Sequence, residues 1–71
     1  MISVSDVKRL LGKEVSCNLP RIFATEVRMT LVGYTLRVDT KSKKVFQQLI
    51  VQDKAGAEYV VRMENVNEPN S

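Results

Sequence analysis

The hydrophobic pattern of residues 26–38 constrains the fold of this chain more than any other feature. Apolar residues first alternate on odd positions: Val27, Met29 and Leu31. Beyond Val32 and Gly33 they occupy even positions: Tyr34, Leu36 and Val38. Because successive side chains of a strand point to opposite faces, a one-residue slip moves the apolar set to the other face. This segment is therefore either two strands divided by a turn or one long strand with a bulge.

We favour the bulge at Val32-Gly33, because the segment holds no turn residue other than the single glycine. A long, bulged strand bends strongly, and such bending allows a small sheet to curl towards a barrel.

Further strands follow from apolar alternation and from the turn residues between the apolar runs. We expect strands at 13–19, 45–52 and 57–63, hairpin loops at 39–44 and 53–56, and a last short turn or strand at 64–66. Residues 20–25 form a connector, whose Ile22 and Phe23 we expect to pack against the core.

A short helix is predicted over about residues 4–11. Ser3 and Asp6 have the spacing of a capping box, in which each side chain accepts a hydrogen bond from the other residue's backbone. An apolar stripe with three- and four-residue spacing follows: Val4, Val7, Leu10 and Leu11. Gly12 suits the left-handed position beyond a helix end.

These elements predict a mostly β fold: a short N-terminal helix followed by a four- or five-stranded antiparallel, strongly bent sheet, in an SH3-like, partly open barrel. A flat sheet with the helix on one face is the alternative. We expect one domain over residues 1–66 and a flexible tail over 67–71.

Size and composition exclude several classes of function. The 71 residues contain one cysteine and no histidine, so neither a disulfide within the chain nor a zinc site of the usual Cys and His ligands can form. A general base of the histidine type is also absent. We therefore expect no enzyme, no metal and no cofactor. A core this small is marginal on its own, which favours a homo-oligomer over a monomer.

The basic residues are unevenly distributed. Residues 28–44 have a net charge of +4, whereas residues 45–71 have a net charge of −2. The bases of the first segment are the candidate nucleic-acid-binding residues: Arg28, Arg37, Lys41, Lys43 and Lys44. Such a surface attracts phosphates, although lysines on loops also serve solubility alone.

The expected strands at 45–52 and 57–63 are apolar on both faces and must be covered twice. The second face carries the candidate interaction residues Phe46, Ile50 and Val60. Either the helix and a closed barrel cover this face, or a partner does. We expect the four aromatic rings to pack inward, although the sequence leaves the exposure of Phe23 and Phe46 open.

The sequence thus predicts a small binding module that contacts nucleic-acid phosphates through its basic strand and loop. The alternative is a protein-interaction or assembly subunit that uses its apolar second face or an open sheet edge. Charged residues within 1–12 and the lone cysteine favour a cytoplasmic location, and no apolar run is long enough for a membrane partner.

Overall fold

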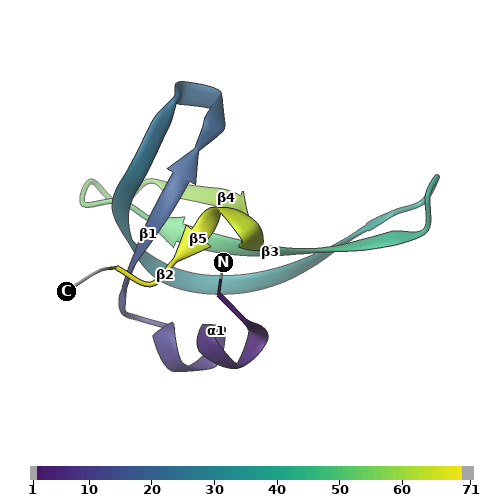
Figure 1. Ribbon diagram of the computed structural model, residues 1–71, viewed down its shortest axis with the longest axis horizontal. Coiled ribbons are helices and arrows are strands. Elements are labelled where there is room, and N and C mark those ends of the chain that lie inside the picture. The colour runs from purple at the N-terminus through teal and green to yellow at the C-terminus, as the bar shows by residue number, and fades with distance from the viewer. Residues whose placement is uncertain (1, 70–71) are drawn as a thin grey trace.

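The computed structural model describes residues 2–69, which form one short helix and a five-stranded antiparallel sheet (Figure 1). The elements are α1 (Val4–Leu10), β1 (Glu14–Leu19), the 3₁₀ turn η1 (Pro20–Ile22), β2 (Ala24–Asp39), β3 (Lys44–Gln52), β4 (Glu58–Arg62), the 3₁₀ turn η2 (Met63–Asn65) and β5 (Val66–Asn67). The strand order is β4-β3-β2-β1-β5. The predicted mostly β architecture with an N-terminal helix is confirmed.

The sheet does not close on itself. Among the described residues β4 and β5 form its two edges, and every other strand pairs with its neighbours in the order given above. The SH3-like barrel is therefore not confirmed, and an open, bent sheet takes its place.

The bulge in the long strand is confirmed. β2 is one continuous strand, and its pairing with β3 shifts by one residue between Leu31 and Gly33. The Ile50 side chain lies close to Gly33 here, since a Cβ on Gly33 would lie 3.2 Å from Cδ1 of Ile50. Figure 1 shows the resulting curvature of β2, which carries its first half against β1 and its second half against β3.

The predicted capping box is present at the start of α1. The Asp6 backbone N–H donates to Oγ of Ser3 at 3.3 Å, and the Ser3 N–H donates to Oδ2 of Asp6 at 3.0 Å. The helix ends at Leu10, one residue earlier than expected, and Gly12 follows with a φ of 82°. Local sequence signals thus set both ends of this element.

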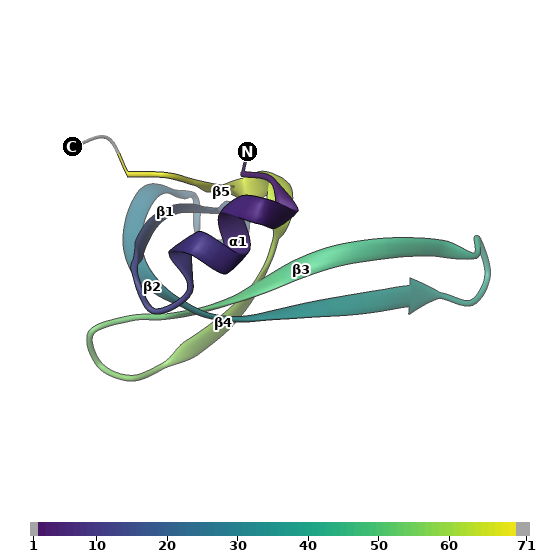
Figure 2. The same ribbon diagram turned by 90° about the horizontal axis from the view of Figure 1, so that it is seen from below.

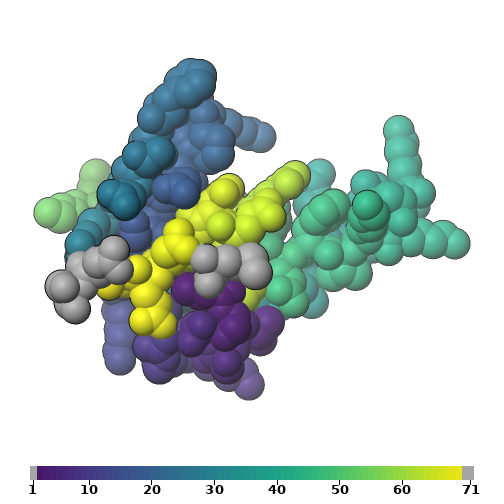
Figure 3. All heavy atoms as spheres, in the orientation of Figure 1, coloured from purple at the N-terminus to yellow at the C-terminus, as the bar shows by residue number. Residues whose placement is uncertain are grey.

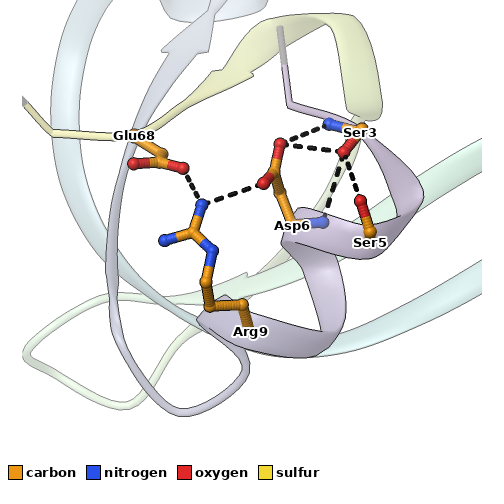
Figure 4. Close-up of polar contacts among 5 residues, drawn as sticks. All are labelled: Ser3, Ser5, Asp6, Arg9 and Glu68. Atoms are coloured by element: carbon orange, nitrogen blue, oxygen red, sulfur yellow. Dashed lines mark hydrogen bonds and ion pairs between the residues drawn. The ribbon is translucent and has the colours of Figure 1, made fainter.

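Arg9 connects α1 to the end of the described chain (Figure 4). Its Nη2 donates to Oδ1 of Asp6 at 2.9 Å and also to Oε1 of Glu68. The hydrogen bond from Arg9, together with those from Ser3, lowers the pKa of Asp6 to about 2. Glu68 belongs to the segment 67–71, which was expected to form a flexible tail. The first residue of that segment, Asn67, lies in β5 instead, and residues 70–71 lie outside the described residues.

The core lies between α1 and the inner face of the sheet (Figure 2). Its buried apolar residues are Ile2, Val7, Leu10, Val15, Cys17, Met29, Leu31, Leu49, Val51, Val61, Met63 and Val66. Burial raises the pKa of the Cys17 thiol to about 11, so the sulfur is a neutral apolar packing group at physiological pH.

Four side chains expected in the core are exposed instead. Phe23 is 95% exposed and Ile22 is 65% exposed, because their turn extends past the end of the sheet, where no second layer covers it. Tyr34 and Tyr59 are about two-fifths exposed. Tyr34 lies opposite Leu49 and Tyr59 lies opposite Val51, and both of these partners are core residues. The two tyrosines themselves lie near the limit of the covered face.

Candidate functional site

The most distinctive part of the surface is a two-stranded arm, which we define as residues 36–47. β1 pairs with β2 only up to Thr30, and β4 pairs with β3 only from Gln48 onwards. Between these limits β2 and β3 pair with each other alone, from Leu36 opposite Gln47 to Asp39 opposite Lys44. The arm therefore projects from the rest of the molecule (Figures 2 and 3).

The arm carries the entire net charge of the chain. Its twelve residues include four bases and one acid, a net charge of +3. The remaining 59 residues include seven bases and seven acids, so their charges cancel. The bases of the arm are Arg37, Lys41, Lys43 and Lys44, and all four are exposed. The structure thus brings together four of the five predicted basic residues.

The two faces of the arm differ in chemistry. The register places Leu36, Val38 and Val45 on the inner face, which continues the face of Leu49 and the core. Arg37 and Lys44 lie on the outer face, because each neighbours an inner-face residue along its strand. The inner face of the arm is therefore mostly apolar, whereas its outer face carries two bases together with Asp39 and Phe46.

Asp39 organises the turn at the tip of the arm. Its Oδ1 accepts a hydrogen bond from the Lys41 backbone N–H at 3.0 Å, and its Oδ2 accepts one from the Ser42 hydroxyl at 2.9 Å. These hydrogen bonds hold the pKa of Asp39 below its ordinary value. Lys43 has a φ of 56°, in the left-handed region. The only acid of the arm thus shapes the turn that presents Lys41 and Lys43.

Arg28 lies apart from the other predicted basic residues. It precedes the bulge in β2, opposite Ser16 of β1, and its Nη1 donates to Oε1 of Glu14 at 2.7 Å. It also lines a polar hollow of about 610 Å³ together with Asp6, Glu26 and Glu68. The charged residues of this lining are three acids and one base, so the hollow does not favour a phosphate.

The three predicted interaction residues share the outer face of β3 and β4. Ile50 lies opposite Val60, and Phe46 lies on the same face of β3, four residues from Ile50. The guanidinium of Arg62 lies over the Phe46 ring, 5.6 Å from its centroid. Val60 is 60% exposed, whereas Phe46 and Ile50 are half-buried. α1 packs on the inner face, so it does not cover these residues.

The exposure of Leu36, Val38 and Val45 was not foreseen from the sequence. Their alternation is the same as that of a strand with one covered face, so the pattern alone does not reveal their exposure. The signal that distinguishes them is the length of the strands, since β2 has 16 residues, whereas β1 has six and β4 has five. A strand so much longer than its neighbours extends beyond the layer that covers it.

Neither a metal-ligand cluster nor a membrane-spanning helix occurs among the described residues. Among residues 2–69 no group of three His, Cys, Asp or Glu side chains could hold a metal ion. The seven residues of α1 fall far short of the roughly 20 that a membrane-spanning helix needs, and no other α-helix is described.

The fold and the arm define a small, mostly β protein with a basic projection. No family model, no curated protein and no solved structure matches the chain.

Proposed function

We propose that this protein is a non-enzymatic nucleic-acid-binding module whose β2–β3 arm contacts phosphates. The observation that carries the proposal is the charge of the arm, which equals the +3 net charge of the whole chain. A compact cluster of exposed bases attracts a polyanion and releases its counterions on binding. The charges of the remaining 59 residues cancel.

The shape of the arm supports the same function. A two-stranded ribbon has the dimensions to enter the major groove of duplex DNA, which is about 12 Å wide. The lysines at the tip and Arg37 on the outer face would then lie near the phosphates at the rims of the groove. Arg28 is left out of this surface, because it is bound to Glu14 on another part of the sheet. The proposal places the protein in the cytoplasm, where its free thiol stays reduced.

The test is a binding titration by fluorescence anisotropy, with labelled 20-base-pair DNA, single-stranded DNA and RNA, at several salt concentrations. The variant Lys41→Glu/Lys43→Glu/Lys44→Glu reverses the charge of the tip. We expect its affinity at low salt to be at least tenfold weaker. We also expect the slope of log affinity against log salt to fall by about 3 for duplex DNA, because about one counterion is released per phosphate contact.

A matched control changes the net charge equally at other exposed sites. Lys8, Lys13 and Lys54 lie in α1, before β1 and in the β3–β4 turn, respectively. The variant Lys8→Glu/Lys13→Glu/Lys54→Glu should keep most of the affinity and of the salt slope. If both triple variants lose affinity equally, net charge alone governs binding and the arm is not the site. If the wild-type protein binds none of the three nucleic acids at low salt, the proposed function is wrong.

A second candidate function is protein interaction through the outer-face patch of Phe46, Ile50 and Val60. The observation that favours it is the 60% exposure of Val60 on β4, which is an edge strand of the sheet. Edge strands with apolar side chains are sites where another chain can add a strand.

A further inference from the structure

The inner face of the arm is an apolar surface that the chain itself does not cover. Leu36 is 56% exposed, Val38 is 61% exposed and Val45 is 58% exposed. Val38 and Val45 lie opposite each other, and Leu36 lies two pairs nearer the core, opposite Gln47. Tyr34 extends this row towards Leu49, so the exposed apolar surface is continuous with the core.

Such an arm is poorly stabilised on its own. An isolated two-stranded hairpin is marginal in water, and it needs a third strand or a packed face to be stable. The arm has no third strand over residues 36–47, since β1 and β4 both end before it, and the apolar side chains of its inner face are exposed. A contiguous exposed apolar patch on a small soluble domain commonly marks an interface.

We propose that the inner face of the arm is covered by the arm of a second copy of this chain, packed face to face about a two-fold axis. With the two arms antiparallel, Val38 and Val45 of one copy lie against Leu36 and Tyr34 of the other. This arrangement is self-complementary, as a two-fold interface requires. It also places the two lysine-bearing tips at opposite ends of the interface, so like charges do not meet.

The apolar surface available to this dimer is small. From the exposed fractions, the four apolar side chains and their symmetry mates offer roughly 500 Å² of apolar area. A standard stable interface buries about 1,600 Å² in total, a little over half of it apolar. The apolar surface is therefore about half of that in a standard interface, and we expect the dimer to be weak.

A hollow beside the inner face provides space for the side chains of the partner. Its volume is about 540 Å³. Its wall includes Val4 of α1, Met63 of η2 and Val45 and Gln47 of the inner face, and it extends to Phe46 and Arg62 at the edge of the outer face. The arm of a second copy lying on the inner face would project side chains into this hollow. The proposal is independent of nucleic-acid binding, because the basic residues of the outer face take no part in it.

The test is sedimentation equilibrium from about 5 to 500 µM, without nucleic acid. We expect the average mass of the wild-type protein to rise with concentration from that of the monomer towards that of the dimer. Val38→Lys places a charge in the proposed interface and should weaken dimerisation at least tenfold. Val45→Thr removes apolar surface without adding charge and should weaken it by a smaller factor.

Val60→Lys is the matched control, because Val60 has nearly the same exposure as Val38 but lies on the outer face. It should change the dissociation constant less than twofold. A wild-type protein that stays monomeric at 500 µM would overturn the proposal. A dimer that withstands Val38→Lys, or that is lost in Val60→Lys instead, would also overturn it and would place the interface elsewhere.

Discussion

Asp6 shows how one side chain serves both local and tertiary structure. Its carboxylate accepts hydrogen bonds from the Ser3 backbone and hydroxyl and from Arg9, which in turn binds Glu68 beside β5. Arg9 is the largest cause of the lowered pKa of Asp6, about 2 against an ordinary 3.8. The folded state therefore favours the ionised carboxylate more strongly than the unfolded state does.

This pKa shift gives a pH dependence with a definite sign. A lowered folded-state pKa contributes stability above the ordinary pKa of about 3.8, and that stability is lost as the pH falls through about 2. In urea denaturation followed by circular dichroism from pH 5 to pH 2, Asp6→Asn should lose less stability than the wild-type protein. Glu58→Gln, at an exposed carboxylate of β4, should keep the wild-type decline. Equal declines in all three proteins would show that Asp6 contributes nothing to the pH dependence.

At the scale of elements, the junction of α1 and β1 depends on Gly12. Its φ of 82° lies in the left-handed region, and a Cβ there would meet nothing within 4 Å. Its backbone N–H donates to the Leu31 carbonyl at 2.8 Å, which fixes the junction against β2. The cost of a side chain at this position is therefore conformational rather than steric.

We expect Gly12→Ala to lower the free energy of unfolding by about 1–2 kcal/mol, which is the cost of the left-handed conformation for a residue with a Cβ. Gly33→Ala should cost less, since Gly33 has no positive φ and its Cβ would meet the movable end of Ile50. Chemical denaturation of both variants checks this order. A greater loss at Gly33 would indicate that the bulge is more tightly constrained than the junction.

The elements differ in how far the sequence predicts them. The capping box and the bulge are encoded by neighbouring residues, so Ser3, Asp6 and the change of alternation at Gly33 were sufficient to predict them. The arm was not predicted, because its exposure depends on where β1 and β4 end relative to β2 and β3. For the same reason the sequence grouped Arg28 with the arm bases, whereas the register pairs it with Ser16 and places it beside Glu14.

At the scale of the whole molecule, the arm gives the two proposals a common structural basis. Its inner face is apolar and continuous with the core, and its outer face and tip carry the net positive charge. Two copies joined through their inner faces would leave both sets of bases exposed to a polyanion. The arm exists because β1 and β4 stop pairing with β2 and β3 before residues 36–47.

The most direct test of the central claim, that the arm is the nucleic-acid contact, is a titration of the ¹⁵N-labelled protein with 20-base-pair DNA, followed in amide correlation spectra. The account predicts that the largest shift changes fall within residues 37–46. Amides of α1 and of the turn at residues 53–56 should change little, although both contain lysines. Changes centred on those segments, or no change at all at low salt, would contradict the account.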